Sequence, residues 1–218
     1  MRKLLGVAMV VAMTMTWTGS ALATTPTEDQ FYPPDSSPGG MTHGAWQGLY
    51  QIWLNEIPLG QNPLFHPNSP RNCELQPGNV VFLGASGSDC DIPAGAAMAF
   101  STTFWECSTA EGLGDTWSEL RHCAVDNFRT DFSAAGLTMK VDGHKLLHQR
   151  RWTSITPGEI IRFPKNNIWG ADPGKSKSVT KGLFYVLKPM SSGDHHVRFH
   201  VNDVNFGTFN VDWWLHVA

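Results

Sequence analysis

The sequence predicts a mainly β fold, a β-sandwich or jelly roll with two short α-helices packed on the sheet. From residue 80 onward, short apolar segments alternate with turns that carry proline and glycine. From Leu137 onward, apolar and polar residues alternate with a period of two, as in half-buried strands. Two other stretches have helical spacing. Several short strands at this spacing are typical of sandwiches and jelly rolls.

The first 23 residues have the layout of a cleavable secretory signal peptide. A short positive stretch from Met1 to Lys3 precedes an apolar run from Leu4 to Met15, and small residues end the segment at Ala23. The apolar run is shorter than the roughly 20 residues that a membrane-spanning helix needs. We therefore expect cleavage after Ala23 and a soluble protein, secreted or periplasmic, without a membrane span.

The mature chain divides into a leader and one domain. Residues 24–42 are rich in proline, glycine, serine and threonine, which predicts a flexible leader. Residues 43–218 are long enough to bury a sizeable core, so we expect a single sandwich-like domain there.

The first predicted helix follows the leader and ends before Pro58. Its apolar residues recur at i, i+3, i+4 and i+7, at Trp46, Leu49, Tyr50, Trp53, Leu54 and Ile57. The second begins at Thr116, because Thr116 and Glu119 form a capping-box pattern. Its apolar side consists of Trp117, Leu120, Cys123, Ala124 and Phe128. We expect this helix to lie against the sheet, held there by a disulfide through Cys123.

The strands are expected in short segments. Residues 80–83 form a continuous apolar run, and a second strand spans residues 98–105 after a turn at residues 90–95. Alternation over residues 137–141 predicts a third, and Asp142-Gly143 is a hairpin signal. The further predicted strands are residues 151–155, 159–163, 183–188, 196–201 and 209–217.

The last two predicted strands each have one apolar and one polar face. The apolar faces consist of Val197, Phe199 and Val201 on one strand and Phe209, Val211, Trp213, Leu215 and Val217 on the other. We expect Val201 to lie opposite Phe209. The facing polar pairs are then His200 with Asn210, Arg198 with Asp212, and His196 with Trp214. A register shift of two residues would instead place Asp212 opposite His200.

Four cysteines follow the signal peptide, and an even number in an exported protein predicts two disulfides. Of three possible connectivities we favour Cys73–Cys90 with Cys107–Cys123, because each closes a loop of fewer than 20 residues. Such a loop contributes about 3 kcal/mol in the chain-entropy model. The alternative is a zinc site, but it requires close C-x-x-C or histidine spacing that these cysteines lack.

Composition excludes several classes of function. Loss of Arg2 and Lys3 with the signal peptide reduces the 16 basic residues to 14 against 19 acidic ones, so the formal charge becomes −5. A basic stripe for nucleic acid is missing. Phosphate loops, dinucleotide fingerprints and a G-x-S-x-G elbow are also missing, so we expect no cofactor and assign no metal. Nine histidines nevertheless leave clusters in space open.

A set of short motifs spreads over residues 46–201. They are Ile57-Pro58 after the tryptophan-bearing helix, Asn62-Pro63-Leu64, Val81-Phe82-Leu83, Cys90-Asp91-Ile92-Pro93-Ala94-Gly95, Glu106-Cys107-Ser108, Glu119-Leu120-Arg121, Val141-Asp142-Gly143 and Ser192-Gly193-Asp194-His195. In this combination the chain resembles a family of exported bacterial proteins without an established activity. The resemblance implies a β-rich fold and brings no catalytic residues. The Pro93-Ala94-Gly95 turn also resembles cupins, but their H-x-H metal motif does not follow it.

The first candidate site is the outward row of the last hairpin. An arginine between two histidines, beside an exposed tryptophan, suits an anionic or sugar ligand, because arginine supplies a bidentate fork and tryptophan a stacking face. The expected ligand-binding residues are Arg198, Asp212, Trp214 and His216. The alternative is a solvated sheet face with an Arg198–Asp212 pair. Alternation places His195 on the other side, where we expect it to bond a turn carbonyl.

The second candidate is an acidic segment around the second helix, with Glu106, Glu111, Asp115, Glu119 and Asp126. Glycoside hydrolysis needs two carboxyl groups about 5–10 Å apart, one with a raised pKa. Glu106 would meet that need if it is buried beside Cys107. The alternative is that these acids cap the helix or face solvent.

These features are compatible with functions of three classes. The first is an exported binding module for carbohydrate or another polar polymer, supported by eight tryptophans after the signal peptide. The second is a polysaccharide-active enzyme, either a hydrolase using Glu106 or a lyase. A lyase would use Arg198 as the cation, His196 or His200 as the base and Tyr185 as the proton donor. The third is a structural protein-binding domain.

Overall fold

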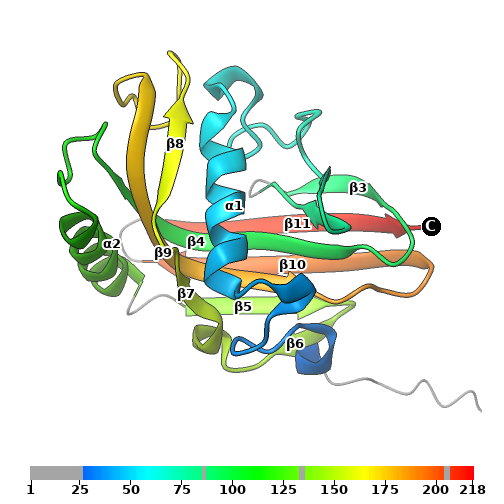
Figure 1. Ribbon diagram of the computed structural model, residues 1–218. Helices are drawn as coiled ribbons and strands as arrows, with labels where there is room; N and C mark the ends of the chain where they lie inside the picture. The colour runs from blue at the N-terminus through cyan, green and yellow to red at the C-terminus, as the bar shows by residue number, and fades with distance from the viewer. Residues whose placement is uncertain (1–26, 85–86, 133–135, 204–206) are drawn as a thin grey trace, which may run out of the picture.

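The computed structural model describes residues 27–218 except 85–86, 133–135 and 204–206. Two β-sheets pack face to face, and two α-helices cover parts of one of them (Figure 1). The prediction of a mainly β fold with two helices is therefore confirmed. The predicted signal peptide, residues 1–23, lies outside the described residues. Within the described part of the chain, no helix is long and apolar enough to cross a membrane.

The first sheet has six strands, and its longest strand, β9, pairs with three others. In order, it consists of β1 (Glu74–Gln76), β2 (Val80–Phe82), β4 (Ala97–Ser108), β9 (Gly174–Leu187) and β7 (Thr153–Ile155), with β8 (Glu159–Phe163) also paired to β9. The β4–β9 pairing contains an irregularity between Ser101 and Thr103. Beyond that point, β9 is the one described strand that pairs with β4.

The second sheet has five strands in the order β3 (Ser88–Ile92), β11 (Gly207–Val217), β10 (Gly193–Asp203), β5 (Gly136–Val141) and β6 (His144–Leu146). β3 pairs with β11 in parallel, whereas the other pairs are antiparallel. Val201 lies opposite Phe209, so the predicted register of the last hairpin is confirmed. Asp142 and Gly143 both have positive φ in the β5–β6 turn, in agreement with the predicted hairpin.

The main core fills the space between the two sheets. Phe100 and Tyr185 from the six-stranded sheet meet Trp213 and Phe199 from the five-stranded sheet, and all four are buried. The Phe100 and Trp213 rings lie 4.8 Å apart. Each fully buried apolar side chain of this size contributes about 1.5–3 kcal/mol.

Helix α1 (His43–Glu56) covers the outer face of the six-stranded sheet (Figure 1). Thr42 caps its start by accepting a hydrogen bond from the Ala45 N–H at 3.2 Å. Its stripe packs as predicted on Phe82, Ala99, Phe184 and Val186, except that Leu49 is exposed. The Tyr50 hydroxyl donates to the Leu83 carbonyl, which satisfies a buried polar group.

Helix α2 (Trp117–Phe132) packs on the extended ends of β4 and β9. The predicted capping box is present: the Glu119 N–H donates to Thr116 Oγ1, and the Thr116 N–H donates to the Glu119 carboxylate. The Cys107–Cys123 disulfide fastens this helix to β4. The Cys73–Cys90 disulfide ties the start of β1 to β3. Both disulfides therefore have the connectivity favoured from the sequence.

Two elements differ from the sequence predictions. The expected leader, residues 24–42, contains short 3-10 helices at Thr27–Gln30 and Pro38–Gly40, and Phe31 is buried against Trp152 and Tyr185. Burial of the Phe31 side chain in the core thus ties this segment to the domain, although its composition is typical of loops. Residues 90–92, expected in a turn, belong to β3, and only the following Pro93–Gly95 segment turns. Two further 3-10 helices span Leu59–Gln61 and Gln149–Trp152.

Candidate functional site

The outward row of the five-stranded sheet, called the polar row below, consists of His196, Arg198, His200, Asp212, Trp214 and His216. Three of these residues come from β10 and three from β11, and cross-strand pairing aligns them as predicted. The opposite faces of both strands carry the buried Val197, Phe199, Trp213 and Leu215. The position of the polar row is thus fixed by the core beneath it.

The centre of the polar row is a stack of two rings. The His196 and Trp214 rings are 3.9 Å apart and parallel to within 2°. Because these residues are cross-strand neighbours, the rings stack across the β10–β11 pair. One indole face is covered by His196, and the other is directed toward β3, where Asp89 pairs with Trp214. Trp214 remains 52% exposed.

Asp212 holds the next part of the polar row together. Its Oδ1 accepts hydrogen bonds from His196 Nε2 at 2.8 Å and from Arg198 Nε at 2.7 Å. Partial burial raises the pKa of Asp212, but the Arg198 and His196 hydrogen bonds outweigh it and place the pKa below its ordinary value. Asp212 therefore stays ionised and fixes the orientation of the His196 ring that supports Trp214.

His216 bridges two carboxylates at the other end of the polar row. Its Nδ1 donates to Asp194 at 2.7 Å and its Nε2 to Asp89 at 2.6 Å. Asp194 and then Asp89 raise the pKa of His216. A hollow of about 530 Å³ adjoins this cluster, with Asp91, Pro93 and Ser192 among the residues that line it.

Two other histidines of this sheet have local roles. His200 donates to the Asn210 side-chain carbonyl at 2.8 Å. His195 bonds the Ser191 carbonyl, as expected from the sequence, and also the Asp142 carboxylate. Burial lowers the pKa of His195, but the Asp142 and Ser191 hydrogen bonds outweigh it and raise the pKa. These contacts close the β5–β6 turn against the start of β10.

Glu106 lies on the other sheet. It shares its face of β4 with Phe104, which packs toward α1, so Glu106 points away from the five-stranded sheet. The structure therefore keeps Glu106, the candidate of the hydrolase hypothesis, apart from His196, Arg198 and His200, the candidates of the lyase hypothesis. The two sheets and the core lie between them.

The lyase hypothesis loses its proton donor, Tyr185. Tyr185 is fully buried between the sheets and packs against Phe31 and Phe100. Burial raises its pKa far above the ordinary tyrosine value. A phenol in this position cannot reach a substrate on the outer face of the five-stranded sheet.

Glu106 itself is buried, as the hydrolase hypothesis requires. Burial raises the pKa of Glu106 well above its ordinary value, and the hydrogen bond and negative charge of Glu111 raise it further, against the effect of the Ser178 hydroxyl. Glu111 is thus near enough to Glu106 to perturb its pKa, and both residues line the same hollow. Of the other acids, Glu119 caps α2.

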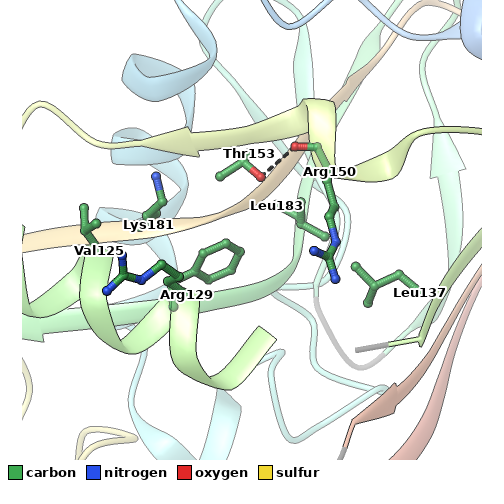
Figure 2. Close-up of a pocket in the computed structure, with 8 residues that line it drawn as sticks. Val125, Arg129, Leu137, Arg150, Thr153, Lys181 and Leu183 are labelled. Atoms are coloured by element: carbon green, nitrogen blue, oxygen red, sulfur yellow. Dashed lines mark hydrogen bonds between the residues drawn. The ribbon is translucent and has the colours of Figure 1, made fainter. Parts of the chain in front are cut away.

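A third concave feature is a basic hollow of about 350 Å³ between α2, β7 and β9 (Figure 2). Val125 and Arg129 of α2 lie on one side with Lys181, and Arg150 reaches toward Leu137 on the other. Burial and the nearby charge of Arg121 lower the pKa of Lys181. Sequence reasoning missed this hollow, because its cations come from three separate elements.

Comparisons with known proteins add little at this point. No protein-family model matches the chain, and no curated protein matches it. Two solved structures are similar in part: the solution structure of amebosin and the crystal structure of the cysteine protease inhibitor EhICP2 from Entamoeba histolytica. Each has 8% sequence identity to this chain and a TM-score of 0.25. The matched region covers 64% of this chain, 96% of amebosin and 94% of EhICP2. A likeness of this size carries no argument about fold or function.

The structure also adds residues that the sequence analysis missed. Asp89 and Asp194 complete the His216 cluster, and the alternation of Asp89 and Asp91 with Cys90 and Ile92 is the signal that could have placed Asp89 on a strand. Among the described residues, no three histidine, cysteine, aspartate or glutamate side chains are grouped so that they could hold a metal ion.

Proposed function

We propose that this protein is an exported binding module that holds a carbohydrate on the polar row. The observation that carries the proposal is Trp214, a half-exposed indole held by a parallel stack on His196. Its other face is directed toward β3, where Asp89 is its partner across the strands. Sugars bind such sites by placing a ring on an aromatic face and their hydroxyls on nearby polar groups.

The polar groups around Trp214 suit a sugar of low charge. Asp89 and Asp194 offer carboxylate acceptors on one side, and Arg198 offers donors on the other. Charges of both signs alternate along the polar row, so neither a strongly acidic nor a strongly basic polymer is favoured over a neutral one. Two disulfides fit an oxidising compartment, which supports secretion or a periplasmic location.

The test is a pull-down of the purified mature protein on insoluble polysaccharides, compared with Trp214→Ala. Loss of the indole stack should weaken binding about tenfold, which corresponds to about 1.4 kcal/mol. Trp117→Ala is the matched control, because Trp117 is also exposed but lies on α2. Equal retention of Trp214→Ala and wild type would contradict the proposal. Release of reducing sugars or unsaturated products in the same samples would indicate an enzyme instead.

A further inference from the structure

A further hollow, called the Glu106 pocket below, lies along the part of β4 where β9 is its one partner among the described strands. Its volume is about 550 Å³, within the range of about 300–1,000 Å³ that is typical of small-molecule sites. The side chains around it are mainly apolar and come from five segments of the chain. They include Phe65, Phe104, Trp105, Leu113, Trp169 and Phe209.

Large apolar side chains gather at the mouth of this pocket. Phe65, Leu113 and Trp169 are each at least 36% exposed, although folding usually hides such residues. Trp169 is held in place, because its Nε1 donates to Asn55 of α1 at 2.6 Å and its ring meets Phe104 edge-on. An apolar opening with a fixed aromatic wall is typical of a ligand site.

The inner wall of the pocket is polar at one place. Glu106 is only 5% exposed, and the Ser178 hydroxyl donates to its Oε1. Its Oε2 is buried and accepts no hydrogen bond from a described donor. Glu111 lies beside it, held by the Ser108 hydroxyl at 2.7 Å. A buried carboxyl group beside a second acid is costly, so this part of the pocket favours a ligand group that donates hydrogen bonds.

The charge of the pair decides which donor fits. Burial and the negative charge of Glu111 raise the pKa of Glu106, so these two acids, side by side in an apolar pocket, are stabilised by a positive charge next to them. Of the described residues that line the pocket, Glu106 and Glu111 are the ones with ionisable side chains. An anionic ligand would be repelled, and a neutral apolar one would bury this charge without compensation.

We propose that the Glu106 pocket binds a small organic cation, in which a protonated amine is attached to an apolar or aromatic body. The ammonium group donates to the Glu106–Glu111 pair, and the body lies among the aromatic side chains, which also favour a cation near their faces. The pocket lies along β4, and Phe209, its one residue from β11, is on the core side of that strand, opposite the polar row. The proposal is therefore independent of polysaccharide binding.

The test uses an amine and an alcohol of equal size, 2-phenylethylamine and 2-phenylethanol, and a slightly larger anion, 3-phenylpropionate, at neutral pH. Binding to the mature protein is measured by ligand-observed NMR titration. We expect the amine to bind at least tenfold more tightly than the alcohol. Glu111→Gln should remove this preference while leaving the affinity for the alcohol within about twofold, because it removes the charge and keeps the shape. Asp91→Asn, an exposed acid on β3, is the matched control and should change neither affinity.

Two further measurements separate this site from others. Trp169→Ala should weaken the amine and the alcohol alike, since it removes the wall of the pocket. Binding of 3-phenylpropionate that persists in Trp169→Ala is expected at the basic hollow of Figure 2, which has the opposite charge. Equal affinity for amine and alcohol, or an amine preference that survives Glu111→Gln in a variant with wild-type circular dichroism, would overturn the proposal.

Discussion

Removal of the Cys107–Cys123 disulfide tests how α2 is held on the sheet. The two cysteines are 16 residues apart. In the chain-entropy model, closure of a loop of this length stabilises the fold by about 3 kcal/mol. Alanine at both positions is the suitable change, because Cys107 is fully buried among Leu120, Ala124 and Val179, where a serine hydroxyl would be costly. Loss of the buried sulfur adds about 1 kcal/mol.

The double variant should therefore lose about 4 kcal/mol of unfolding free energy, measured by urea titration with far-ultraviolet circular dichroism and linear extrapolation. For a chain of this size, the Tm should fall by roughly 8–16 °C. The matched control is removal of Cys73–Cys90, whose separation of 17 residues predicts about the same entropic loss. Cys73 is less buried than Cys107, so the control should lose about 3 kcal/mol. A loss below about 1 kcal/mol in the Cys107/Cys123 variant would refute the reasoning.

Three further perturbations probe the fold. Burial raises the pKa of Glu106 in the folded protein, so the native fold loses stability as the pH rises from the ordinary glutamate pKa to the raised one. Glu106→Gln removes this loss, so its Tm advantage over wild type should increase with pH over that range. Equal Tm differences from pH 4 to 8 would contradict this. Glu119→Gln should behave oppositely, because hydrogen bonds from the N–H groups of residues 115 and 116 lower the pKa of Glu119. The ionised Glu119 therefore stabilises the fold above the ordinary glutamate pKa, and this stabilisation is lost as the pH falls. In a series of thermal unfolding curves, the variant should have a lower Tm than wild type at neutral pH and the same Tm in acid. Gly182→Ala should cost about 1–3 kcal/mol in urea unfolding, since its Cβ would lie 2.6 Å from the Phe104 Cβ, whereas Gly60→Ala faces open space and should change little.

The local elements could be predicted where one physical signal dominates. The capping box of α2 depends on residues three apart, so Thr116 and Glu119 suffice to locate the start of the helix. The polar row could be predicted because strand alternation fixes which side chains share a face. The register of β10 and β11 then followed from burying Val201 and Phe209 on the same side.

The remaining features depend on contacts between distant segments. Phe31 looks like part of a leader until Trp152 and Tyr185, more than 100 residues away in the sequence, provide its site. β3 was hidden because its partner is the final strand, far along the chain. The Glu106 pocket could be foreseen only as an acidic segment, since its apolar wall comes from loops that the sequence does not connect.

The strand order of the five-stranded sheet has a consequence for biosynthesis. β11 is the last strand in the sequence, yet it lies between β3 and β10 and supplies Trp213 and Leu215 to the core. Ser88 and Trp213, which are neighbours across β3 and β11, are separated by most of the domain's length. A growing chain therefore cannot complete this sheet until nearly all of it has left the ribosome, and pairing over such long sequence separations is slow. The order of the strands delays folding, and a chain that folds late stays longer in the unfolded form that can be threaded through a narrow channel.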